Sequence, residues 1–116
     1  MKRDMDLIRT VLFKAEALPD ASGHSISVEG RNHAEVCEHL RLAQGAGLIE
    51  ARFQRGDATA CVALRLTWAG HEFLDAARQI RIWEKAKEMA KRTAEGITMT
   101  SLKVALAHLM GRPSLP

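Results

Sequence analysis

Histidines and cysteines lie close enough in the sequence to raise the question of metal binding. His33 and Cys37 stand at i and i+4, which puts both side chains on one face of a helix, and Cys61 or His71 would have to complete the set. Zinc prefers thiolate and imidazole ligands, but its cysteines usually come in close pairs on loops. Cys37 and Cys61 form no such pair and fall in predicted secondary structure. We therefore expect buried, reduced thiols rather than a disulfide, and no metal or other cofactor.

A second group of polar residues has the chemistry to contact nucleic acid. Arg and Asn side chains form paired hydrogen bonds with guanine and adenine edges, and Arg also binds phosphates. The candidates on the exposed front of a predicted helix are Arg31, Asn32, His33, Glu35 and His39, and those near the tip of a predicted β-hairpin are Arg52 and Arg55. Helix capping and a charged turn that deters strand pairing are the alternative explanations of these residues.

Catalytic patterns are missing from the sequence. It has no glycine-rich phosphate loop, no nucleophile elbow and no paired carboxylates in a plausible cleft, so we expect no enzymatic activity and no catalytic residues. It also has no tyrosine and only 3 phenylalanines, which disfavours a platform that stacks single-stranded bases.

Length and composition predict one soluble globular protein. A chain of 116 residues can bury one cooperative core, and its 47% hydrophobic and 27% charged residues are ordinary for such a protein. The net charge of +3 permits a nucleic-acid partner without requiring one. No apolar run is long enough for a membrane span, and the first residues lack the apolar core of a signal peptide, so we expect a cytoplasmic protein without membrane contact.

The first elements expected along the chain are a helix and a short strand. Asp4 is predicted to cap the helix and Pro19 to end it. Residues 20–30 then read as a loop and a strand in which Ile26 and Val28 alternate with polar residues. This stretch is too short for the full helix that a helix-turn-helix would place ahead of its recognition helix.

The central stretch predicts a second helix and a β-hairpin. The helix runs from about Asn32 to Gln44, and Gly45 and Gly47 supply its exit. Two strands with alternating apolar residues follow, joined by a turn whose tip is Gly56 and Asp57. The inward residues of the helix are predicted to be Val36, Leu40 and Ala43. One face of the first strand carries Ile49, Ala51 and Phe53, and one face of the second carries Val62, Leu64 and Leu66.

The remaining residues predict further helices. Thr67 caps a third helix with Trp68 and Trp83 as core residues at its margins, and Thr98 or Thr100 caps a last helix that ends near Met110. The inward stripe of the third helix is predicted to be Phe73, Leu74, Ala77 and Ile80. A stretch of mixed charges between them reads as a solvated helix face. We expect residues 1–80 to form one domain and residues 81–116 a helical extension that packs on it or forms a homodimer interface.

Two stretches resemble known families. Residues 36–49, VCEHLRLAQGAGLI, and residues 66–74, LTWAGHEFL, are similar to winged-helix regulators of the multiple-antibiotic-resistance (MarR) and phenolic-acid-repressor (PadR) kinds. The opening MKRDMDLIR, with the same two stretches, more closely resembles a family of small uncharacterised bacterial and prophage proteins. The resemblance implies a mostly helical α+β fold of the winged helix-turn-helix type: helix, short strand, helix, β-hairpin wing and helix, with one or two extra C-terminal helices.

Two functions are open at this point. In the first, the protein is a bacterial or phage regulator of transcription that binds double-stranded DNA, with the front of the second helix in the major groove and the wing on phosphates. In the second, it is a phage- or mobile-element-encoded module that binds a host protein and modulates it without DNA. Glu35 and Glu38 on the second helix would repel phosphates, which favours the second function.

Overall fold

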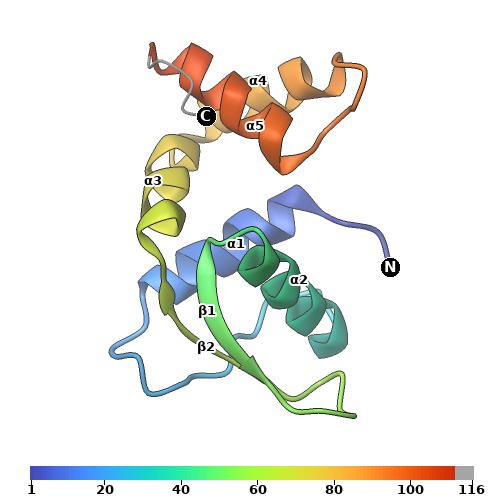
Figure 1. The fold of residues 1–116 in the computed structure, drawn as a ribbon, viewed down its shortest axis with the longest axis vertical. Helices are drawn as coiled ribbons and strands as arrows, with labels where there is room; N and C mark the ends of the chain where they lie inside the picture. The colour runs from blue at the N-terminus through green and yellow to red at the C-terminus, as the bar shows by residue number, and fades with distance from the viewer. Residues whose placement is uncertain (112–116) are drawn as a thin grey trace. The chain divides into compact units, whose positions relative to one another are not determined.

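The computed structural model describes residues 1–111, and it confirms a mixed α+β chain that is mostly helical (Figure 1). Its elements are α1 (Met5–Glu16), α2 (His33–Gly45), β1 (Ile49–Phe53), β2 (Cys61–Leu66), α3 (Trp68–Ala77), α4 (Ile80–Lys91) and α5 (Met99–Leu109). No helix among these residues is long and apolar enough to cross a membrane.

The chain divides into two compact units, of which the first spans residues 1–71 and the second begins at residue 72. This division falls within α3, earlier than the boundary at residue 80 that the sequence suggested. The last residues of the expected C-terminal extension, 112–116, lie outside the described part of the chain.

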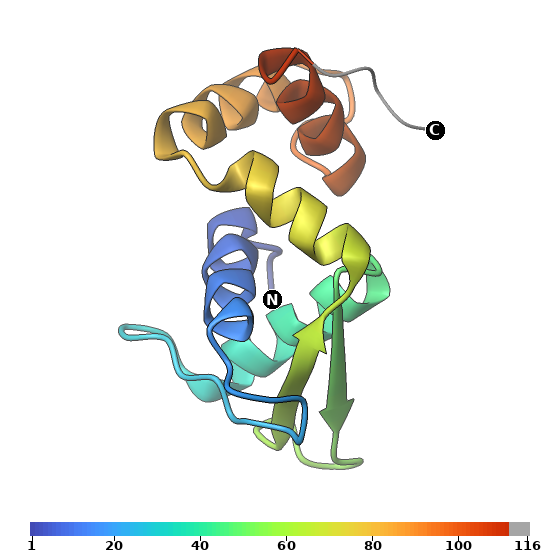
Figure 2. The ribbon, with the colours of Figure 1, turned by 90° about the vertical axis from the view of Figure 1, so that its left-hand side faces the viewer.

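The first unit packs α1 and α2 against the β-hairpin. The carboxylate of Asp4 accepts hydrogen bonds from the backbone N–H groups of Asp6 and Leu7, which confirms it as the cap of α1. The apolar stripe of α1 is buried against α2 and β2, and α2 also contacts both strands. Figure 2 shows the tip of the hairpin extending beyond both helices of this unit.

The hairpin is antiparallel and has the predicted turn. Its register runs from Ile49 opposite Leu66 to Phe53 opposite Cys61, with one irregularity between Glu50 and Ala51. Gly47 has a φ of +78°, which lets the chain leave α2 and enter β1 at once, as expected for a helix exit.

The prediction of a short strand around Ile26 and Val28 was wrong, because no strand forms there. Only His24 pairs with the hairpin, through two backbone hydrogen bonds with Ala63 of 2.9 and 2.8 Å. Ile26 is buried and its neighbours Ser25 and Ser27 are exposed, so the alternation in the sequence reflects burial of one side chain in the core. No helix forms between α1 and α2, in agreement with the sequence.

The second unit pairs α4 with α5, and here two expectations need correction. Ile80 was predicted on the inward stripe of the third helix, but that helix ends at Ala77, and Ile80 begins α4 with 53% of its surface exposed. Trp83 is fully buried in edge-to-face contact with Phe73 and was correctly predicted as core. Trp68 was not, because it lies 81% exposed at the start of α3.

The start of α3 closes the base of the hairpin. Thr67 donates its backbone N–H to the carbonyl of Leu48 and its hydroxyl to the carbonyl of Gly47, and the same hydroxyl accepts from the N–H of Gly70. A Cβ at Gly70 would collide with the carbonyl oxygen of Leu48, so the helix can approach the chain this closely only at a glycine.

We expect Gly70→Ala to lower the free energy of unfolding by about 2–4 kcal/mol, because backbone atoms must move to accept the methyl group. Urea unfolding followed by circular dichroism measures the change. The matched control is Gly45→Ala, where the added methyl meets nothing within 4 Å and a helix gains a better helix former. Equal stability of the two variants would contradict the close packing at Gly70.

Candidate functional site

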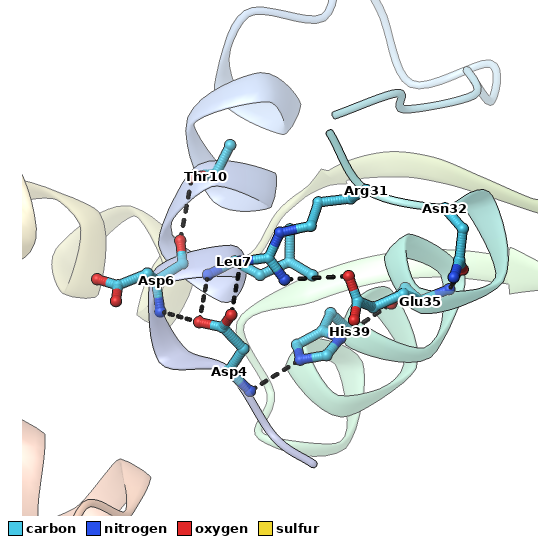
Figure 3. Close-up of polar contacts among 8 residues, drawn as sticks. All are labelled: Asp4, Asp6, Leu7, Thr10, Arg31, Asn32, Glu35 and His39. Atoms are coloured by element: carbon cyan, nitrogen blue, oxygen red, sulfur yellow. Dashed lines mark hydrogen bonds and ion pairs between the residues drawn. The ribbon is translucent and has the colours of Figure 1, made fainter. Parts of the chain in front are cut away.

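The start of α2 is tied to the start of α1 by an ion-pair network (Figure 3). The guanidinium of Arg31 contacts the Asp4 carboxylate at 2.6 Å and the Glu35 carboxylate at 3.0 Å. Asn32 caps α2 by accepting the backbone N–H of Glu35 at 2.8 Å. Arg31 and Glu35, both predicted to face DNA, are therefore engaged within the protein, and Asn32 performs the capping that was its alternative explanation.

His39 was expected on the exposed front of α2, and this was wrong. Its side chain is fully buried, because position 39 follows Val36 by three residues and so lies on the inward face of the helix. Its Nε2 accepts the backbone N–H of Asp4 at 2.9 Å, and its Nδ1 lies 2.9 Å from the carbonyl oxygen of Glu35. These partners assign a neutral ring that carries its hydrogen on Nδ1.

Asp4 is held as a carboxylate by the groups around it. Burial raises the pKa of Asp4, but the hydrogen bond from Arg31, the backbone N–H groups of Leu7 and Asp6, and the charge of Arg31 together outweigh this effect. The pKa of Asp4 therefore lies below its usual value of 3.8. One residue thus caps α1, pairs with Arg31 and donates its own N–H to His39.

His33 lies apart from this network, on the side of α2 that faces the hairpin. It is half-buried and lines a shallow pocket together with Ser25, Arg52, Gln54 and Thr59. Nearby, hydrogen bonds from the hydroxyl and the backbone N–H of Thr59 lower the pKa of Asp57, with a smaller contribution from the charge of His33. The pocket lining thus combines these polar side chains with apolar ones, Phe53 and Val62 among them.

Cys37 and Cys61 form a disulfide between α2 and β2, with their Cα atoms 5.6 Å apart. The expectation of reduced thiols was wrong, because it rested on the absence of a close pair in the sequence. The hairpin register sets Cys61 opposite Phe53 and against the inward face of α2, and this brings together residues separated by 24 positions.

Arg52 and Arg55 lie on the hairpin and are exposed, as predicted for a wing. Neither forms an ion pair within residues 1–111. The other exposed arginines of α2 and the hairpin are paired internally: Arg41 with Glu38 and the ring of Phe53, and Arg65 with Glu50 at 2.8 Å. The predicted residues thus separate into an internal network at one side of α2 and a hairpin group at the other.

Sequence reasoning missed the second role of Asp4. Its partners Arg31 and His39 lie 27 and 35 positions away, and a capping aspartate gives no sign of a long-range contact. A buried position for His39 could have been found, because it shares the helical spacing of the predicted inward residues Val36 and Ala43.

We expect Asp4→Asn to lower the free energy of unfolding by about 1 kcal/mol at neutral pH, since the amide still caps α1 but no longer pairs with Arg31. A carboxyl group whose pKa is lowered in the folded state stabilises the fold at pH values above its ordinary pKa. This stabilisation is lost as pH falls through the folded-state pKa. Urea unfolding between about pH 7 and pH 2 should therefore show that the free energy of unfolding falls less with decreasing pH in the variant than in the parent.

Asp75→Asn is the control for this prediction, because Asp75 is an exposed carboxylate in a surface pair with Arg78. In this variant the free energy of unfolding should decrease with falling pH as much as it does in the parent. Identical acid profiles for Asp4→Asn and the parent would show that the network contributes nothing through the charge of Asp4.

Comparison with known proteins places the chain in a family. Residues 2–97 match the family described as "Hypothetical protein (DUF2513)". An uncharacterized protein of Haemophilus influenzae is 35% identical over 106 residues, which cover 89% of this chain and 90% of that protein. No solved structure matches the chain. The predicted resemblance to an uncharacterised bacterial family is confirmed, and the chain belongs to the DUF2513 family.

Proposed function

We propose that residues 1–71 form a winged-helix domain that binds double-stranded DNA and acts in transcription regulation. The order of α1, the paired residue His24, α2, the hairpin and α3 supports this proposal, because a winged helix has a short strand between its first helices and a hairpin after its recognition helix. In this chain α2 alone occupies the place of the two helices that usually precede the wing.

The observation that carries the proposal is the distribution of unpaired positive charge. Arg31, Arg41 and Arg65 are neutralised by carboxylates of the same unit. Arg52 and Arg55 are exposed on one hairpin and have no such partner among residues 1–111. Two arginines at the tip of a wing suit contacts with DNA phosphates or the minor groove.

Base contacts are assigned to the first residues of α2. Asn32 is exposed and uses its carbonyl oxygen as the cap, which leaves its amide NH₂ to donate to a base or phosphate. His33 and Arg52 line the same pocket, which supports their facing the same stretch of DNA. His39 has no part in this proposal because it is buried.

A protein partner is the second candidate function. Basic and acidic residues are equal in number in residues 1–71, and the whole net charge of +3 falls in residues 72–116. A neutral unit attracts DNA less than a basic one, and Trp68, 81% exposed, is the kind of residue that anchors protein interfaces. The partner would be a host protein or a second copy of the chain.

For DNA binding, we expect micromolar affinity for mixed-sequence duplex DNA that falls steeply with salt. Fluorescence anisotropy at several salt concentrations gives the slope of log affinity against log salt. Arg52→Ala with Arg55→Ala should weaken binding to every sequence and make this slope shallower by about 2, because two phosphate contacts are lost. The matched control, Arg41→Ala with Arg65→Ala, removes the same charge from internally paired positions and should change the slope less.

Equal slopes for the two double variants would show that Arg52 and Arg55 make no phosphate contacts of their own. No binding by the parent protein even at low salt would reject DNA as the partner. In that case a loss of self-association in Trp68→Ala, measured by sedimentation, would support the second function.

Sequence preference provides a separate prediction about Asn32. Asn32→Ser keeps a good helix cap and removes the amide group, so the free energy of unfolding should change by less than about 0.5 kcal/mol. We expect the variant to bind mixed DNA with nearly the parent affinity but to select different sequences from a randomised duplex pool. Unchanged selection would show that Asn32 acts only as a cap.

A further inference from the structure

The disulfide lies beside a histidine that completes a set of metal ligands. The ligand atoms of His33, Cys37 and Cys61 all lie within 4.8 Å of one another. His33 and Cys37 occupy successive turns of α2, and Cys61 is the first residue of β2. The two sulfurs are buried, whereas His33 and Cys61 also line the open pocket beside the hairpin.

We propose that the reduced protein binds zinc or a similar borderline-soft divalent cation through Cys37, Cys61 and His33, with water as the fourth ligand. Two thiolates and one neutral imidazole are ligands that zinc prefers, and the two thiolates balance its charge in a largely buried place. The pocket gives a water molecule access, and its lining residues Ser25, Gln54 and Thr59 supply polar groups for it.

The disulfide and the metal exclude each other. A sulfur in a disulfide is no thiolate, so the site needs a dithiol reductant that transfers two electrons to the Cys37–Cys61 bond and becomes a disulfide itself. Binding of the cation then releases the two thiol protons. In the reverse direction hydrogen peroxide takes two electrons from the thiolates and two protons from solvent, which yields two water molecules, the disulfide and the free cation. The redox state of the protein therefore controls metal occupancy.

This inference goes beyond the proposed function, and its test uses no DNA. The full chain is reduced with a phosphine, desalted without oxygen and titrated with cobalt(II), which reports tetrahedral thiolate sites by its visible and charge-transfer absorption. We expect the reduced parent to bind one cobalt ion with these bands, zinc to displace it, and hydrogen peroxide to release it. The oxidised parent should show no such bands. Bands that survive oxidation, or a reduced parent without them, would overturn the proposal.

Single variants test the ligand set. Cys61→Ser should abolish most of the charge-transfer absorption. His33→Ala should weaken cobalt binding by on the order of 100-fold, because the loss of a residue that only hydrogen-bonds to a metal ligand already lowers metal affinity by about 10- to 100-fold. The His33→Ala variant keeps both cysteines, so formation of its disulfide after oxidation, read by mass spectrometry, verifies its fold. The control His71→Ala changes an exposed histidine of α3 and should bind like the parent. Equal affinity of His33→Ala and the parent would overturn the three-ligand site.

Discussion

The attachment of the first turn of α1 to the first half of α2 is the contact on which the first unit depends. Asp4 supplies a cap, a carboxylate for Arg31 and a backbone N–H for the buried ring of His39. Each of these groups would be costly to bury alone, and together they leave no buried side-chain polar atom of the described residues without a partner. The network sets the rotation of α2, and that rotation decides which of its faces meets the hairpin.

This rotation explains how the polar residues of α2 are distributed. The face that carries His39 is turned inward against α1, so the helix has few free groups there for any partner. The opposite edge presents His33 and Cys37 to the hairpin, beside Arg52. Any ligand of this unit is therefore best placed at the junction of α2 with the hairpin.

Local patterns in the sequence predicted the elements well and their long-range contacts poorly. The caps Asp4, Asn32 and Thr98 and the exit at Gly47 follow from residues within one turn, where side chain and backbone interact directly. The ion pair of Arg31 and the disulfide depend on how α1, α2 and the hairpin pack, and no local pattern encodes that packing. Of the candidate site, the exposed hairpin arginines were foreseen, and the internal role of Arg31, Glu35 and His39 was not.

The hairpin is fastened at both ends of its strands. Hydrogen bonds from Thr67 hold its base to residues 47–48, and the disulfide holds Cys61, next to the tip, to α2. A cross-link that spans 24 positions stabilises a fold by about 3 kcal/mol through the entropy of the unfolded chain. A partner that meets the tip loop therefore finds strands that are already ordered, and association costs little conformational entropy beyond that of the loop itself.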